Sequence, residues 1–275
     1  MEQPTIVLDA PRQARPIKRR WRAGFPLGLV LPLLALTGAE IGVRAGMVPA
    51  NLLPPPSAVL QALSWLIDNG LPAHVGASTL RVAAGFAIGA LLALPLGAAV
   101  ALSRGAERLL DPSFQALRAI PSLAWVPLLL LWFGIDETPK LILIAIGAFF
   151  PVYMGVAAGI RGVERSLIEV GQLYRLAPAA LARRVLLPAA LPSVLTGLRN
   201  GLSLAWMFMV AAELIAASRG LGYLLTDGRE TGRADIMLAA IVLLALLGKL
   251  SDSAMQALER RSLAWRDSYL DQDKR

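Results

Sequence analysis

Residues 165–192 read RSLIEVGQLYRLAPAALARRVLLPAALP, a basic and helix-forming stretch in a chain otherwise dominated by apolar runs. The stretch is too polar to cross a membrane, and its apolar residues recur too regularly for a slack loop. The pattern predicts one helix over about 165–175. A second short helix should begin at Pro178, which suits the first turn of a helix, and stop before Pro188. Periodicity alone leaves two interpretations open: a rigid hairpin that docks to a soluble partner, and an amphipathic hairpin that lies on lipid headgroups.

The composition of the whole chain indicates a polytopic membrane protein. Of its 275 residues, 56% are hydrophobic and 17% are charged, whereas soluble domains contain about 45–50% apolar and about 25% charged residues. The chain has no cysteine, which excludes disulfides, thiol catalysis and cysteine-ligated metals. Its single histidine, His74, cannot build a multi-histidine site. We therefore predict no catalytic residue, no metal site and no cofactor.

The apolar runs predict about six transmembrane helices and hence an all-α fold. Each run approaches the length needed to cross about 30 Å of hydrocarbon. The runs cover about 25–43, 79–103, 115–135, 138–160, 193–217 and 235–256. A cleaved signal peptide is the competing interpretation of the first run, but the run is long and follows a long basic segment, which favours a retained helix. Residues at about 57–68 are predicted to form an amphipathic helix.

The distribution of Lys and Arg predicts that both termini are cytoplasmic. In that orientation the basic tail at 1–24, the loop at 161–192 and the tail at 258–275 lie inside, and few cations remain on the opposite side. Those few are Arg44, Lys140, Arg219, Arg229 and Arg233. This asymmetry follows the positive-inside rule. It also accounts for the net charge of +8 without a nucleic-acid partner.

Small residues recur every four positions in several predicted spans. Such stripes let helix backbones approach closely in lipid, where no hydrophobic force draws helices together. The stripes are Gly85, Gly89, Ala93, Gly97 and Ala101; Gly147, Pro151, Gly155 and Gly159; and Gly197, Gly201 and Ala205. Pro95, Pro121, Pro127 and Pro151 are expected to kink or locally break their helices. Both a generic packed bundle and a bundle that rearranges fit this pattern.

Several motifs resemble those of ABC importer permeases. Within the opening stretch, Glu169-Val170-Gly171, Arg175 and Val185-Leu186-Leu187-Pro188 resemble the EAA loop of that family. Motifs elsewhere extend the resemblance over about 52–270 and include Leu52-Leu53-Pro54-Pro55-Pro56, Leu131-Trp132-Phe133-Gly134-Ile135, Gly197-Leu198-Arg199 and Gly220-Leu221-Gly222-Tyr223-Leu224. Together they are similar to the subgroup for aliphatic sulfonates, nitrate and taurine, and within it to the aliphatic sulfonate permeases.

The resemblance implies a type I ABC importer (MetI-like) permease fold in the bacterial inner membrane. The implied organisation is a cytoplasmic tail at 1–24, a first transmembrane helix and periplasmic segment at 25–72, a transmembrane domain at 73–257 and a C-terminal tail at 258–275. The implied partners are a second copy of the chain, two ATPase subunits, a periplasmic or lipid-anchored substrate-binding protein and the lipid bilayer. No Gly-x-x-x-x-Gly-Lys-Ser/Thr motif is present, so ATP hydrolysis is expected on a separate subunit.

The resemblance also implies that the loop at 161–192 couples the chain to the ATPase. Its candidate coupling residues are Glu169, Gly171, Arg175, Leu176, Ala177, Leu187 and Pro188. Arg175 departs from the family, which usually has glycine there. Since arginine does not adopt a left-handed backbone conformation cheaply, we expect either a helical turn or a differently shaped loop.

Charged residues inside spans are costly in lipid and are therefore candidates for function. Glu213 lies towards the outer end of the fifth predicted span and is a candidate for the translocation pathway or its outer gate; a buried hydrogen-bond partner is the alternative. Arg199 and Arg81 are candidates for attracting an anion, and Arg199 is also close enough to the inner interface to snorkel.

Two other classes of protein compete with a transporter. An intramembrane enzyme needs clustered nucleophiles, bases or metal ligands in its spans, and the predicted spans contain no histidine pair, no cysteine and no close carboxylate pair. A membrane scaffold does not require an EAA-like loop. The predicted substrate is an aliphatic sulfonate, with taurine, nitrate, bicarbonate or a pyrimidine precursor as alternatives, because the binding protein does most of the selection in such importers.

Overall fold

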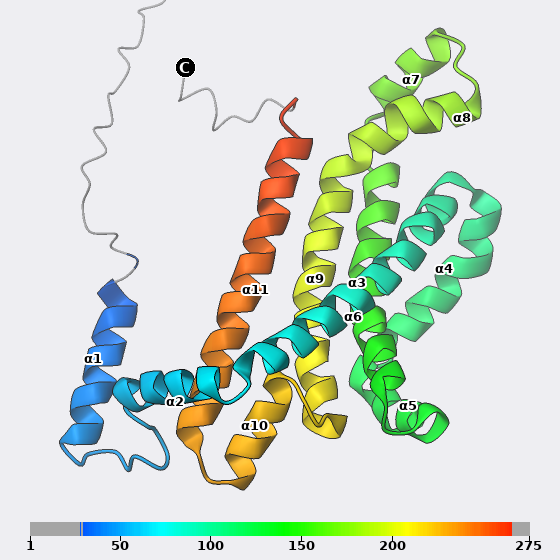
Figure 1. Ribbon diagram of the computed structural model, residues 1–275. Coiled ribbons are helices and arrows are strands. Elements are labelled where there is room, and N and C mark those ends of the chain that lie inside the picture. Colours follow the sequence, from blue (N-terminus) through cyan, green and yellow to red (C-terminus); the bar gives the residue numbers. More distant parts are fainter. Residues whose placement is uncertain (1–27, 29, 266–275) are drawn as a thin grey trace, which may run out of the picture.

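The computed structural model describes residue 28 and residues 30–265 of the chain. The basic tail at 1–24, the start of the first predicted span and the end of the C-terminal tail lie outside the described residues. Throughout the described part the fold is all-α (Figure 1). Its elements are α1 (Val30–Arg44), α2 (Pro56–Asp68), α3 (Leu71–Leu102), α4 (Arg104–Ala119), η2 (Ser122–Trp125), α5 (Val126–Phe133), α6 (Glu137–Arg161), α7 (Arg165–Leu173), α8 (Pro178–Leu181), η3 (Ala182–Leu186), α9 (Leu187–Ala216), α10 (Leu221–Glu230) and α11 (Ala234–Ser262).

Within the described residues, four helical segments are long and apolar enough to cross a membrane. They are α3, α6, α11 and the continuous segment Pro178–Ile215. A fifth crossing results if α4 and the η2–α5 pair count as one, but these two bend by 88° at their junction. The predicted span over 115–135 is therefore not one continuous helix, and the expectation that Pro121 breaks it is confirmed. Helix α1 lies inside the first predicted span, which stays a prediction because its beginning is not described.

The break in that segment follows from proline chemistry. Pro121 has no N–H to donate to the preceding turn, and its ring pushes the residue before it away from helical geometry. Ile120 accordingly has an extended backbone, with φ −76° and ψ 124°. The chain then resumes as a 3₁₀ turn and a short helix. By contrast, α3 continues through Pro95 and α6 through Pro151.

Helices α3, α6 and α9 form the centre of the bundle, and α6 contacts both of the others (Figure 1). Small residues make this close packing possible. A Cβ at Gly155 of α6 would lie 2.7 Å from the Cα of Gly197 in α9, and a Cβ at Gly89 of α3 would lie 2.5 Å from the carbonyl oxygen of Ala145 in α6. These contacts confirm that the small-residue stripes are helix-packing surfaces.

The predicted amphipathic helix at 57–68 is confirmed as α2, which buries Ala62 and Leu66 in an apolar cluster with α10 and α11. The start of α3 differs from the prediction. Helix α3 begins at Leu71, several residues before the predicted start at 79, because Gly70 and Pro72 provide a favourable beginning for a helix. Its polar first turns therefore belong to the same continuous helix as the apolar span.

The opening stretch forms a helical hairpin that projects from one end of the bundle (Figure 1). Here the predicted stop before Pro188 is wrong, since α8, η3 and α9 form one continuous segment. The reason is the π turn η3, in which the N–H of Leu187 donates to the carbonyl of Ala182, five residues earlier. This wider turn immediately precedes Pro188 and accommodates a residue that lacks an N–H.

Candidate functional site

At the tip of the hairpin, the α-helix α7 ends with one residue, Arg175, in the left-handed backbone conformation. The N–H of Arg175 donates to the carbonyl of Gln172 at 2.8 Å, and the N–H of Leu176 donates to the carbonyl of Gly171 at 3.2 Å. This is the Schellman pattern that satisfies the last carbonyls of a helix, here α7. Arg175 has φ +52° and is the one non-glycine residue with positive φ in the described part of the chain.

The expectation that Arg175 would avoid the left-handed conformation is therefore wrong. A left-handed backbone costs an L-residue about 1–2 kcal/mol. The two hydrogen bonds of the helix ending, together with the packing of the hairpin, outweigh that cost. The loop thus keeps the shape that a glycine would give it, and the guanidinium of Arg175 is exposed at its tip.

Gly171 holds the two arms of the hairpin together. It is buried, and a Cβ at this position would collide with the side chain of Leu181 from the facing arm. The same Cβ would lie 3.7 Å from Leu176. Gly171 and Leu176 therefore have structural positions inside the hairpin. A larger residue at 171 requires that the Leu181 side chain moves aside or that α7 moves away from the segment that leads into α9.

The other predicted coupling residues face outward. Glu169 is exposed and accepts a hydrogen bond from Arg165 at 3.0 Å. Ala177, Leu187 and Pro188 are also exposed. Beside Glu169, α7 presents an apolar face formed by Leu167, Val170, Leu173 and Tyr174, of which Leu173 is 82% and Tyr174 79% exposed. A contiguous exposed apolar face rimmed by charges is typical of a protein interface.

At the opposite end of the bundle, buried charges join three helices. Arg81 of α3 donates to Glu213 of α9 at 2.6 Å and to Glu137 of α6 at 2.6 and 2.7 Å. Lys140 donates to Glu137 at 2.9 Å. The Glu213 side chain is fully buried and that of Arg81 nearly so, whereas Glu137 is 51% exposed. The two cations balance the two carboxylates, so the cluster carries no net charge.

Glu213 also fixes the loop between α9 and α10. Its carboxylate accepts hydrogen bonds from the hydroxyl of Ser78 at 2.8 Å and from the N–H of Gly222 at 2.8 Å. The N–H of Leu221 in turn donates to Ser78 at 2.8 Å, and Arg81 donates to the carbonyl of Arg219 at 2.6 Å. The structure thus brings together Glu213 and Arg81, two of the three residues predicted for the pathway or gate.

Arg199, the third of these residues, lies elsewhere. It projects from α9 towards α11, donates to both carboxylate oxygens of Asp252 and approaches Glu259 at 4.0 Å. This ion pair joins two helices in the half of the bundle that carries the hairpin. None of the three predicted residues lines the cavity described next.

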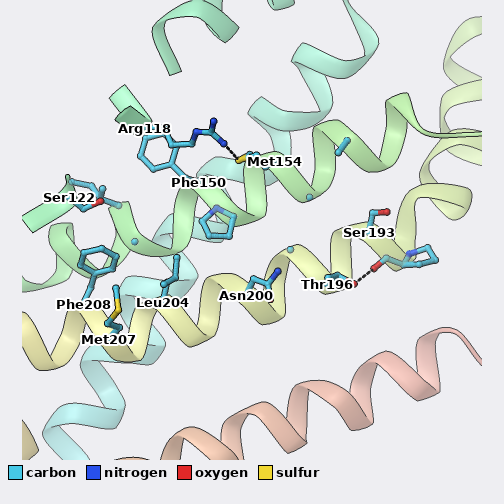
Figure 2. Close-up of a pocket in the computed structure, with 17 residues that line it drawn as sticks. Arg118, Ser122, Phe150, Met154, Ser193, Thr196, Asn200, Leu204, Met207 and Phe208 are labelled. Carbon is cyan, nitrogen blue, oxygen red and sulfur yellow. Dashed lines mark hydrogen bonds between the residues drawn. The ribbon is translucent and has the colours of Figure 1, made fainter. Parts of the chain in front are cut away.

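A cavity of 790 Å³ opens between the end of α4, η2, α6 and α9 (Figure 2). Its walls combine apolar and polar side chains. The polar ones are Arg118, Ser122, Ser193, Thr196 and Asn200. Phe150, Met154 and Leu204 supply much of the apolar wall. Of the described residues that line the cavity, Arg118 alone is charged, and its guanidinium donates to the sulfur of Met154 at 2.8 Å.

The sequence reasoning missed these cavity residues, although a signal was present. Ser193, Thr196 and Asn200 recur at helical spacing within the predicted span 193–217, which is otherwise strongly apolar. Arg118 also carried a signal, because it is a charged residue inside the predicted span at 115–135. The break at Pro121 places it at a helix end. In the described residues no group of three or more acidic or histidine side chains has the arrangement of a metal site.

Comparisons with known proteins agree with the resemblance seen in the sequence. The family model for "binding-protein-dependent transport system inner membrane component" matches residues 85–263. The putative aliphatic sulfonates transport permease protein SsuC of Bacillus subtilis is 42% identical to this chain, with 91% of each covered. SsuC of Escherichia coli is 41% identical, with 93% of this chain and 97% of that protein covered. The E. coli taurine transport system permease protein TauC is 35% identical, with 95% and 98% covered.

Among solved structures, a chain of the MetNI methionine ABC transporter in an inward-facing conformation has the same fold. The TM-score is 0.58, and the match covers 72% of this chain and 96% of that one at 23% identity. A likeness at this identity concerns the fold alone. It confirms the predicted MetI-like all-α fold.

Proposed function

The chain belongs to the family of binding-protein-dependent transport system inner membrane components, and from this premise we propose that it forms the membrane pathway of an importer for aliphatic sulfonates. As a member of this family it is a multi-pass permease component of an ABC importer and not itself the catalytic subunit. The assignment of the substrate rests on the sequence identity of 42% and 41% to two proteins named putative aliphatic sulfonates transport permease, along more than nine-tenths of the chain. Taurine is the second candidate, because TauC is 35% identical over a similar length.

In this proposal the hairpin at 165–186 docks to an ATPase subunit on the cytoplasmic side, with both termini on that side. Three observations support docking over a position on lipid headgroups. The hairpin projects from the bundle, Gly171 packs its arms tightly together, and α7 offers an exposed apolar face beside Glu169. A second copy of the chain, two ATPase subunits and a substrate-binding protein complete the proposed complex.

The pathway and gate residues are proposed to act through helix packing. Arg81 and Glu213 tie α3, α6 and α9 together at the end far from the hairpin, and Arg199 ties α9 to α11. Breaking the buried Arg81–Glu213 pair would leave an uncompensated charge inside the protein, so these ion pairs favour an arrangement that keeps their partners in contact. They are therefore suited to hold one of the two packings between which a transporter alternates.

The proposed substrate is tested by growth of a strain that lacks this chain on single sulfur sources. We expect no growth on ethanesulfonate, normal growth on sulfate, and restoration by the intact gene. Normal growth of the deletion strain on ethanesulfonate, with loss of growth on taurine instead, would favour the second candidate. Failure of the purified chain to associate with an ATPase subunit would contradict the proposed complex itself.

A further inference from the structure

The cavity beside α9 contains a polar face within a membrane-spanning helix. Ser193, Thr196 and Asn200 are spaced three and four residues apart, which places them on one side of α9. All three are exposed in the single chain. Polar side chains in a span face protein or water and not hydrocarbon, because unsatisfied polar groups are costly in lipid. This side of α9 is therefore turned towards an aqueous space or a partner, and the cavity lies directly on it (Figure 2).

The side chains of Ser193 and Asn200 have hydrogen-bond donors that no other described residue uses. The hydroxyl of Thr196 donates to the carbonyl of Pro192 at 3.0 Å and is thereby occupied. The side chains of Ser193 and Asn200 make no hydrogen bond to any other residue that the structure describes. Figure 2 shows Asn200 pointing from α9 towards α6, across the cavity. An amide and a hydroxyl thus remain available to a ligand.

The charged residue at the cavity, Arg118, likewise has no acidic partner among the described residues. Arg81, Arg161 and Arg199 each pair with a carboxylate. Arg118 differs, since in the described part of the chain its contact is the thioether of Met154, a weak acceptor. No acidic side chain is among the described residues that line the cavity. The described residues that line the cavity therefore carry one net positive charge.

We propose that this cavity is a binding site for a small organic anion on its way through the membrane. The guanidinium of Arg118, the amide of Asn200 and the hydroxyl of Ser193 would donate to the anionic headgroup, while Phe150, Met154 and Leu204 face its alkyl part. A sulfonate group offers three acceptor oxygens and one negative charge, which match a guanidinium with several donors. The assignment to a sulfonate rests on the proposed function, whereas the assignment to an anion rests on the cavity. Its 790 Å³ is within the usual range of small-molecule sites.

The absence of native cysteine permits a direct test in the assembled transporter. Thr196→Cys places a single thiol of this chain in the cavity. Two reagents are compared: 2-sulfonatoethyl methanethiosulfonate, whose headgroup is an ethanesulfonate, and its cationic trimethylammonium analogue. With either reagent the thiolate attacks the thiosulfonate sulfur, a disulfide forms and methanesulfinate leaves. Because any effect on the thiol is common to both reagents, the ratio of their rates reports the preference of the cavity for an anion.

We expect Arg118→Gln to lower this anion-to-cation ratio about 25-fold. One charge at roughly 4 Å in water changes the rate of each reagent about fivefold, in opposite directions for the anion and the cation. The matched control is Arg108→Gln, an exposed arginine on the same helix that does not line the cavity. It should leave the ratio unchanged, and Arg118→Lys should retain most of it. An unchanged ratio in Arg118→Gln, with the cationic reagent still reacting at the normal rate, overturns the anion site.

Uptake of labelled ethanesulfonate by the complete transporter in proteoliposomes separates this inference from the proposed function. We expect Arg118→Gln to reduce uptake at low concentration about tenfold or more, because a hydrogen bond to a charged group usually contributes that much to affinity. Arg108→Gln should behave like the native chain. If the native transporter takes up no ethanesulfonate while the ratio depends on Arg118, the proposed substrate fails and the anion site stands. If uptake is normal in Arg118→Gln, the assignment of the site to the substrate route is overturned even where the ratio responds.

Discussion

Replacing Glu213 with alanine removes the centre of the buried charge cluster at the end of α9. The carboxylate accepts hydrogen bonds from Ser78 at 2.8 Å, from Arg81 at 2.6 Å and from the N–H of Gly222 at 2.8 Å. Its side chain is fully buried. Alanine therefore leaves a buried guanidinium, a buried hydroxyl and a buried N–H without their common acceptor.

The expected loss of stability depends on the hydrogen bonds that Arg81 keeps after Glu213 is removed. Removing one partner of a buried ion pair costs about 3–5 kcal/mol. Arg81 keeps its bonds to Glu137, which is 51% exposed and so remains solvated. The cost of Glu213→Ala should therefore fall near the lower end, at about 3 kcal/mol. Glu213→Gln keeps an acceptor oxygen but loses the charge, and we expect about half that cost, ~1.5 kcal/mol.

The free energy of unfolding can be measured by titrating the purified chain with dodecyl sulfate in mixed micelles, with tryptophan fluorescence as the signal. Glu107→Gln is the matched control, because Glu107 pairs with Arg161 where both side chains are exposed, at 44% and 39%, and the same substitution there should cost at most about 1 kcal/mol. The double variant Arg81→Met with Glu213→Leu replaces the pair with apolar side chains. It should recover the part of the loss that is due to the unpaired guanidinium, but not the part due to the Ser78 hydroxyl and the N–H of Gly222, which still lack an acceptor.

Two results would refute this reasoning. If Glu213→Ala is as stable as the native chain, the cluster does not act as a buried ion pair. If Glu107→Gln costs as much as Glu213→Gln, burial does not determine how much each carboxylate contributes to stability. In either case the proposal that this cluster holds one packing of α3, α6 and α9 loses its energetic basis.

Three further predictions concern the hairpin. Glu169→Lys should abolish transport while leaving membrane insertion intact, because it reverses an exposed charge in the proposed ATPase interface; a normal rate of binding-protein-stimulated ATP hydrolysis would contradict this. Gly171→Val should weaken co-purification with the ATPase, since its side chain collides with Leu181, and the additional change Leu181→Ala should restore it; no restoration would mean that the steric explanation is wrong. Arg175→Gly should stabilise the hairpin by about 1 kcal/mol by removing the cost of a left-handed arginine, which slower amide exchange over 165–186 would show and faster exchange would disprove.

The sequence predicted those parts of the fold that depend on periodic packing. The small residues around Gly89 and Gly155 mark helix contacts because lipid leaves close backbone approach as the main way to associate. The failures are local and involve proline. Pro121 breaks its segment as expected, whereas α3 and α6 continue through Pro95 and Pro151, and Pro188 lies in a continuous helix that was predicted to stop. Proline alone does not decide between these outcomes, because a π turn one residue earlier can accommodate it.

The candidate sites were predictable to different degrees. The hairpin carries a sequence motif with fixed spacing, so its residues could be named in advance. Arg81 and Glu213 could be singled out because charges are rare inside spans, but their pairing across 132 residues could not. The cavity could not be located, since Arg118 reaches it only through the bend after α4. Long-range placement of this kind depends on helix packing that no local pattern encodes.

Helix α9 connects the hairpin, the cavity and the buried charge cluster around Glu213. It continues from the π turn of the hairpin, carries Ser193 and Asn200 along the cavity, and ends beside Glu213. Its 30 residues span about 45 Å at 1.5 Å per residue, with no break in the helical segment. A displacement of the hairpin by a bound ATPase therefore acts on a stiff element whose far end is tied to α3 and, through Arg81, to α6. We expect variants at Gly171 and at Glu213 to affect the same step of transport for this reason, although they lie at opposite ends of the bundle.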